Sequence, residues 1–483
     1  MSNGHIPNPK ESKLEPTSET AEEAPSAEKR TLLALFAILV LDLLAFTCIL
    51  PLFPSLLDFY GSEGHKDSLY EAFDFGLRSF KRAVGAPDTG RFKSVFFGGL
   101  LGSLFSFLQF LSSPIVGALS DRYGRKPLLL LAVLGSLLSY LLWSSASTFS
   151  LFVLSRVVGG LSKASVSIAT AVVSDVCAPS RRGRGMAVVG VAFSVGFLIG
   201  PSIGAWFAKS IRSSASTVGG APSTEHFYAA PAYFAVALTA IELVCIAFLL
   251  PETLPVAKEK KADRSDSRRV VDFVHPKSLF QFAAVERSLP SSDVVLLRQV
   301  GAVYFLYLLL YSGMEFTMTF LTHLRFNYDS AMQGRMYLFA GVIMICIQGS
   351  YVRRLADGKH GRAAIGGVLV VVGSYLTMGL SRSHALFYLA LAFYAYSSAL
   401  VVPCLTTIVS GFGDETEKGA IMGVFRSLGA LARAIGPFFA SAAFWLFGPT
   451  ITYVVGALLF SVPLALLWKL CASLKLASTA KDQ

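Results

Sequence analysis

Residues 117–127 read GALSDRYGRKP and place one acid and three bases between two long apolar stretches. The stretch before them runs from Ser94 to Leu119, and the stretch after them runs from Leu128 to Trp143. An α-helix of about 20 apolar residues crosses the hydrocarbon core of a bilayer, which is about 30 Å thick. We therefore interpret residues 117–127 as a short charged hairpin between two membrane-spanning helices.

The composition of the whole chain agrees with this interpretation. Of its 483 residues, 53% are hydrophobic and only 15% are charged, whereas soluble domains carry about 25% charged residues. Apolar stretches of spanning length recur roughly twelve times along the chain. The predicted fold class is an all-α membrane protein with twelve transmembrane helices.

A long polar segment after the sixth apolar stretch divides the chain into two halves. We predict a disordered cytosolic tail at 1–30, a six-helix bundle at 31–250, a cytosolic linker at 251–292, a second six-helix bundle at 293–470 and a cytosolic tail at 471–483. The loop at 58–93 carries apolar residues at helical spacing, so we expect an external amphipathic helix there.

The net charge of +11 is a signal of topology. Lys and Arg concentrate in alternate short loops, and the positive-inside rule assigns such loops to the cytosol. Both termini are then cytosolic. The pattern is compatible with the plasma membrane and with an internal membrane, and it does not indicate nucleic-acid binding.

The two halves repeat each other at one spacing. Three features recur 236 positions apart: Asp121 and Asp357, Gly183 and Gly419, and the pairs Gly200-Pro201 and Gly436-Pro437. A shared offset indicates tandem halves that are related by pseudo-symmetry.

Several segments resemble the major facilitator superfamily, and within it the drug:proton antiporters with twelve spans. The segments are GALSDRYGRKP (117–127), RVVGG (156–160), GFLIGPSIGAW (196–206) and LDLLAFTCILPLFPSLL (41–57). YSGMEFTMTFL (311–321) and GVFRSLGALARAIGPF (423–438) resemble a tetracycline transporter-like branch of animal members. The resemblance implies two six-helix bundles that transport a substrate by alternating access.

The resemblance also gives the charged hairpin a role. Gly117 lets two helices approach closely, and family members aim the acid at the position of Asp121 toward the positive end of the eleventh helix, here near Gly419. We expect a latch that closes the cytosolic side. Its predicted residues are Gly117, Asp121, Arg122, Gly124, Arg125 and Lys126. The alternative is a simple cytosolic anchor.

Ionisable residues inside the spans are the candidate transport residues, because an unpaired charge is unfavourable in hydrocarbon. Four bases and three acids fall there, and their slight positive excess favours an organic anion. We predict substrate binding by Lys163, Arg426 and Arg433. We predict proton coupling by Asp42 and Glu315, with Arg156 beside them. Internal salt bridges are the alternative, and Glu242 has the weakest claim to a role.

Small residues and prolines are predicted to serve helix packing, at Gly196, Gly200, Pro201, Gly204, Gly436 and Pro437. The six cysteines lack metal-ligand spacing, and we find no phosphate loop or nucleophile motif, so we expect neither an enzyme nor a metal or other cofactor.

The sequence therefore predicts a secondary active transporter of amphiphilic organic anions or drugs that is coupled to protons and works as a monomer in a lipid bilayer. The alternatives are a uniporter or cationic-drug exporter of the same fold, and a non-transporting receptor or scaffold.

Overall fold

The structure is a computed structural model of the chain. It describes residues 18–481 except 53–55, 57–58, 63–64, 87–89, 218–223, 255–274, 287, 329, 357 and 415. Most of the predicted cytosolic linker, more than half of the predicted N-terminal tail, and Asp357 lie outside the described residues.

The first half of the described chain is helical throughout its apolar stretches. Its helices are α1 (Ser18–Thr47), α3 (Ser68–Ala83), α4 (Gly90–Tyr123), α5 (Arg125–Ser144), α6 (Phe149–Ser162), α7 (Ser165–Val176), α8 (Arg182–Thr217) and α9 (Thr224–Leu249), with 3-10 turns η1 (Leu50–Leu52) and η2 (Pro179–Arg181).

The second half repeats this pattern. Its helices are α11 (Pro276–Phe280), α12 (Ser291–Phe326), α13 (Ser330–Ser350), α14 (His360–Leu380), α15 (His384–Ser410), α16 (Lys418–Phe447), α17 (Pro449–Leu459) and α18 (Ser461–Lys481), with the 3-10 turn η3 (Val352–Arg354). The described residues contain twelve helical segments long and apolar enough to cross a membrane. The predicted fold class is thus confirmed.

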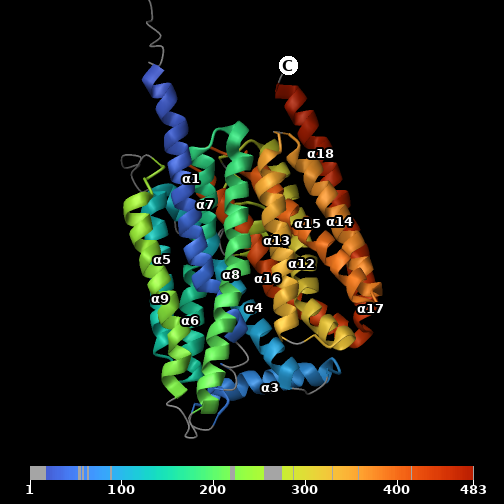
Figure 1. The fold of residues 1–483 in the computed structure, drawn as a ribbon. Coiled ribbons are helices and arrows are strands. Elements are labelled where there is room, and N and C mark those ends of the chain that lie inside the picture. Colours follow the sequence, from blue (N-terminus) through green and yellow to red (C-terminus); the bar gives the residue numbers. More distant parts are fainter. Residues whose placement is uncertain are drawn as a thin grey trace, which may run out of the picture.

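The helices run between two ends of the molecule (Figure 1). The start of α1 and the end of α18 lie at one end, which we call the termini end, and α3 lies across the opposite end, which we call the α3 end. Because successive spans alternate in direction, the hairpin at 117–127 lies at the termini end.

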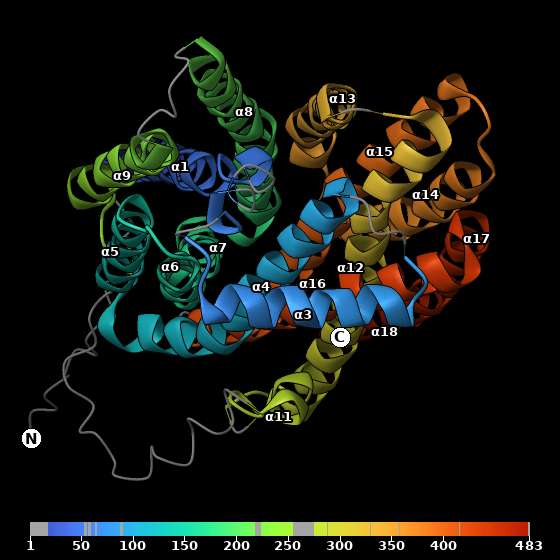
Figure 2. The ribbon, with the colours of Figure 1, turned by 90° about the horizontal axis from the view of Figure 1, so that it is seen from below.

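The two halves meet mainly along α4 and α16, which lie side by side (Figure 2). Glycines make this close approach possible: a β-carbon at Gly117 would overlap the carbonyl of Gly419, and one at Gly423 would stand 2.7 Å from the carbonyl oxygen of Ser113. Small residues of this kind let helix backbones touch in membranes.

The residues predicted to serve packing occupy similar positions. A β-carbon at Gly196 or Gly200 of α8 would overlap Leu43 or Thr47 of α1, and one at Gly436 of α16 would stand 2.6 Å from the carbonyl oxygen of Leu309. Gly204 is buried in α8, Pro201 lies inside α8, and Pro437 lies inside α16.

The fourth span is not one continuous helix. It is divided into α6 and α7, and Lys163 ends α6 with a non-helical backbone (φ −79°, ψ 63°). Arg156 lies within α6, whereas Lys163 lies at the break between the two helices.

α3 contacts both halves at the α3 end (Figure 2). Its Tyr70 ring packs edge-on against Phe149 of α6, with centroids 5.4 Å apart, and its Phe80 ring lies 5.0 Å from that of Phe438 in α16. Asp67 caps the helix: its carboxylate accepts hydrogen bonds from the backbone N–H of Tyr70 (2.8 Å) and of Ser150 (2.7 Å). Asp67 thus ties the start of α3 to the start of α6.

We predict that Asp67 makes this tether sensitive to acid. Partial burial opposes ionisation, but the hydrogen bonds from Tyr70 and Ser150 outweigh it and lower the pKa of Asp67 below its ordinary 3.8. The tether is therefore complete above that value and weakens as the pH falls through the lowered pKa. Asp67→Ala should destabilise the α3 start by about 1 kcal/mol, so that its amides exchange about fivefold faster. Asp67→Asn keeps one oxygen acceptor, so its amide exchange rate should lie between those of the wild type and Asp67→Ala. Unchanged amide exchange in both variants would contradict the assignment of Asp67 as the tether.

Candidate functional site

The latch hairpin joins the two halves through one carboxylate. Asp121, at the end of α4, accepts a hydrogen bond from the backbone N–H of Gly419 (2.7 Å) with one oxygen and from that of Ala420 (2.6 Å) with the other. Both N–H groups belong to the first turn of α16, where a helix leaves its amides unpaired and carries positive partial charge. The Asp121 carboxylate of the first half thus caps the N-terminus of α16 in the second half.

Arg125 holds that carboxylate in place. Its side chain is completely buried, and its guanidinium donates to Asp121 (2.5 Å), Asp175 of α7 (2.9 Å) and the hydroxyl of Ser120 (2.8 Å). A buried guanidinium is tolerated only when it is paired in this way. Asp175 was not predicted from the sequence as a latch residue. The available signal is that it is the one acidic residue of the fourth span and follows a long apolar stretch.

The other predicted latch residues cap α5 or face outward. Gly124 has a positive φ of 97°, and a β-carbon there would lie 2.6 Å from Glu252. The carboxylate of Glu252 accepts from the backbone N–H groups of Arg125 (2.9 Å) and Lys126 (3.0 Å), which caps α5. Lys126 donates to the carbonyl of Ala247. Arg122 is exposed beside the Tyr123 ring.

Further contacts cross between the halves at and below the termini end. Arg182 of α8 donates to the carbonyl of Ser410 at the end of α15 (3.2 Å), and Ser194 of α8 donates to the side chain of Gln348 in α13 (2.8 Å). Gly183 leaves room for the His360 ring. The termini end is therefore closed in this conformation.

A buried charge cluster lies inside the first half. Lys163 forms an ion pair with Asp42 of α1, whose other oxygen accepts from the hydroxyl of Ser165 (2.6 Å). Glu242 of α9 has no exposed surface, and neither of its carboxylate oxygens has a hydrogen-bond partner in the described part of the chain. A buried carboxylate without hydrogen-bond partners is unfavourable when ionised.

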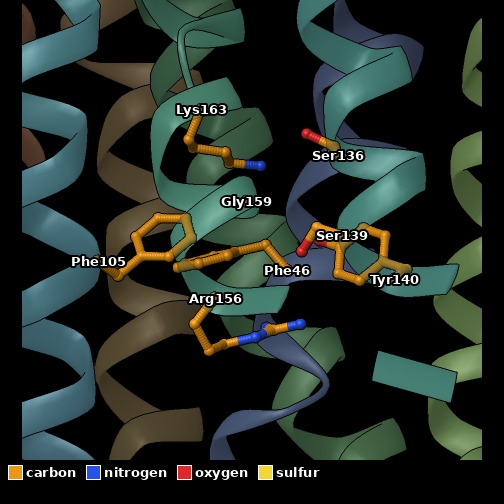
Figure 3. Close-up of a pocket in the computed structure, with 8 residues that line it drawn as sticks. All are labelled: Phe46, Phe105, Ser136, Ser139, Tyr140, Arg156, Gly159 and Lys163. Atoms are coloured by element: carbon orange, nitrogen blue, oxygen red, sulfur yellow. The ribbon is translucent and has the colours of Figure 1, made fainter. Parts of the chain in front are cut away.

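Arg156 lies apart from these acids. Its guanidinium packs over the rings of Trp143 (5.2 Å), Phe152 (5.5 Å) and Tyr140 (5.9 Å), a cation–π arrangement. Figure 3 shows Arg156 and Lys163 pointing to the same side, with Phe46 and Phe105 between them. The cavity that these side chains line measures about 10 Å³, room for about one water molecule.

The second half carries the remaining candidate charges of the spans. Glu315 of α12 accepts a hydrogen bond from the Tyr394 hydroxyl (2.7 Å). Arg433 of α16 donates to the side-chain oxygen of Gln109 in α4 (3.4 Å), and Arg426 lies over the Phe193 ring of α8 (5.4 Å). All three charged side chains are half-buried. Each arginine thus belongs to one half and contacts the other.

Gln109, which was not predicted from the sequence, connects Lys163 of the first half with Arg433 of the second. Its amide nitrogen donates to the carbonyl of Lys163 (3.0 Å), which the break between α6 and α7 frees, and its oxygen accepts from Arg433. The available signal was a glutamine in the middle of an otherwise apolar span. The structure therefore brings Lys163 and Arg433 close together, although the Lys163 ammonium is turned toward Asp42.

The charges of the two clusters are compensated differently. In the first half, Lys163 is paired with Asp42 and Arg156 is stacked on aromatic rings, whereas Arg426 and Arg433 at the boundary between the halves form no ion pair with a described residue. Fixed guanidiniums at such a boundary favour an anion with a carboxylate or similar planar group. Within the described residues, no three His, Cys, Asp or Glu side chains come together so as to hold a metal ion.

Comparisons with known proteins agree with the resemblance of the motifs. The family model described as Major Facilitator Superfamily matches residues 35–437. Major facilitator superfamily domain-containing protein 10 of Mus musculus is 42% identical over 92% of this chain and 94% of that protein. The tetracycline resistance protein, class H, of Pasteurella multocida is 24% identical over 90% of this chain and 94% of that protein. The crystal structure of the human organic anion transporter MFSD10 (TETRAN) has a TM-score of 0.83 at 42% identity and covers 91% of this chain and 99% of that chain.

We predict that Asp121→Asn opens the termini end. The amide keeps only one oxygen acceptor and loses the negative charge, so the closed arrangement should lose about 1.5–3 kcal/mol, which is about 10- to 150-fold in population. Distances between spin labels at the exposed positions Ser180 and Ala356 report the change. Asp414→Asn, at an exposed acid near the start of α16, should leave the distances as in the wild type. A wild-type distance distribution for Asp121→Asn would contradict the latch.

We predict that Lys163 and Asp42 depend on each other for stability. Lys163→Met leaves Asp42 buried without its counter-charge, which should lower stability by about 3–5 kcal/mol. Adding Asp42→Asn removes the stranded charge and should restore much of the loss. Thermal unfolding in detergent measures both variants; equal losses in the single and double variants would show that the pair is not coupled.

Proposed function

Because the chain belongs to the Major Facilitator Superfamily, we propose that it carries amphiphilic organic anions by secondary active transport coupled to protons. It is a multi-pass membrane transporter and not an enzyme. The human protein that shares 42% identity is described as an organic anion transporter, which supports the substrate class.

One observation carries the proposal: the pair of arginines on α16. Arg426 and Arg433 are both half-buried, and both face groups of the first half. The Arg433 guanidinium donates a long hydrogen bond (3.4 Å) to the neutral side-chain amide of Gln109, and it forms no ion pair with a described residue. A bound carboxylate would give it a stronger, charge-assisted partner. We propose Arg433 as the principal anion-binding residue, with Arg426 and Lys163 beside it and aromatic rings such as Phe193 as the apolar wall.

The Asp42–Lys163 pair provides a mechanism for coupling to protons. While Asp42 is ionised, it holds the Lys163 ammonium away from the substrate. Protonation of Asp42 breaks this ion pair, and the Lys163 ammonium can then bind the anionic substrate. Glu315 is the second proton-coupling candidate, since its carboxylate would repel an anion when ionised and would not when protonated. Arg156, between the rings, is proposed to stabilise the first half during this change.

The closed latch defines one step of the cycle. We propose that the termini end is cytosolic, since the basic loops gather there. In the conformation described, the substrate site then has no access to the cytosol. Separation of Asp121 from α16 would open that access. Transport requires both states, because a substrate must be bound on one side and released on the other.

A second candidate is export of a cationic drug. The similarity to tetracycline resistance proteins favours it. A cation-selective site needs unbalanced acids, and the arginines of α16 make the boundary between the halves basic. The two candidates differ in their dependence on Arg433, which would repel a cation and bind an anion.

The test is uptake of a panel of amphiphilic acids into vesicles that contain the purified protein, with and without an imposed pH gradient. We predict faster uptake when the substrate side is more acidic. Arg433→Gln should lower uptake at least tenfold without changing thermal stability, since about 1.5–3 kcal/mol of charge-assisted bonding is lost. Arg382→Gln, at an exposed arginine of the α3 end, is the matched control. Equal uptake with and without the pH gradient would refute coupling to protons. Wild-type uptake by Arg433→Gln would refute Arg433 as the anion-binding residue.

A further inference from the structure

A cavity of about 310 Å³ opens between the two halves at the termini end. Its walls are Arg184, in the first turn of α8, and Gly349, Arg353 and Arg354, from the end of α13 and η3. All four residues are exposed. The cavity is separate from the arginines of α16, which lie deeper along the helices.

The cavity is strongly positive and unbalanced. Three guanidiniums line it, and none of the three forms an ion pair or hydrogen bond with any residue of the described chain. Arg125, by contrast, is paired with Asp121 and Asp175. Guanidinium groups remain charged at every physiological pH, so the repulsion among these three persists unless an anion enters.

The chemistry of the walls selects a compact, highly charged anion. Guanidiniums bind phosphate oxygens in bidentate geometry, and a dianionic phosphate monoester satisfies several of them at once. The cavity has room for such a group beside Gly349, since a β-carbon at this residue would meet no atom within 4 Å. Basic pockets between membrane helices commonly receive phosphorylated headgroups in this way.

We propose that this cavity binds a terminal phosphate group, carried by a lipid headgroup or by a soluble phosphate compound, and that the bound group holds the termini end closed. Arg184 belongs to the first half, whereas Arg353 and Arg354 belong to the second. An anion between them bridges the halves only while they are together. It therefore binds the closed state more tightly and shifts the population toward it.

This inference rests on the proposed alternating-access function for its consequence, but binding itself is measured without transport. The chain should be purified and placed in phosphatidylcholine nanodiscs alone, with phosphatidylinositol 4-phosphate, or with phosphatidylglycerol at matched total charge. A further arm adds inorganic pyrophosphate to the phosphatidylcholine nanodiscs. The readouts are the thermal midpoint and the distance between spin labels at Ser180 and Ala356.

Gly349 provides a matched pair of variants. Gly349→Glu places a carboxylate among the arginines, and Gly349→Gln places the same volume without charge. We expect phosphatidylinositol 4-phosphate to raise the midpoint of the wild type and of Gly349→Gln by about 2–4 °C and to enrich the short distance, and to leave Gly349→Glu unchanged. Phosphatidylglycerol should have little effect on any of them.

The outcomes separate cleanly. A shift with the phosphorylated lipid alone identifies a lipid headgroup as the ligand, and an additional shift with pyrophosphate shows that soluble phosphates also bind. The proposal is overturned if neither ligand shifts the wild type, if Gly349→Glu responds as Gly349→Gln does, or if phosphatidylglycerol acts equally. Loss of anion uptake in the vesicle assay would affect the proposed substrate and leave these binding results intact.

Discussion

The hydrogen bonds from the first turn of α16 to Asp121 are the constraint on which the rest of the structure depends. They satisfy amides that a helix cannot satisfy itself, and they do so with a carboxylate from the other half. The glycine contacts of α4 and α16 make the approach close enough for both bonds. Arg125 then fixes the carboxylate to α5 and α7, so the hairpin, its span and the linker residue Glu252 close the termini end as one unit.

The placement of charge follows from the division into two halves. In the first half, Lys163 is paired with Asp42, Arg125 is paired with Asp121 and Asp175, and Arg156 is stacked on aromatic rings. At the boundary, the two arginines of α16 contact the Phe193 ring and the Gln109 amide and form no ion pair with a described residue, which leaves an excess of positive charge there. This excess is available to a ligand, because the protein itself does not neutralise it.

Much of this could be predicted from the sequence, and the limits have physical reasons. Twelve helices follow from apolar length alone, and confirmed membership of the superfamily follows from motifs as specific as residues 117–127. The ion pair of Lys163 and Asp42 could not be predicted, because the partners are 121 residues apart and the direction of Lys163 depends on a break in its helix. Gln109 was missed since its two bonds require knowledge of which carbonyl that break frees. Arg426 and Arg433 were recognisable because charge within a span is rare.

The central claim is that the halves must separate at the termini end during transport. The most direct measurement is to join them across that end and follow organic-anion uptake. Gly183→Cys and His360→Cys, in a background without the six native cysteines, place two thiols where a glycine now accommodates a ring. A short, reducible thiol cross-linker between them should abolish uptake, and reduction should restore it. Undiminished uptake with the cross-link complete would contradict the account.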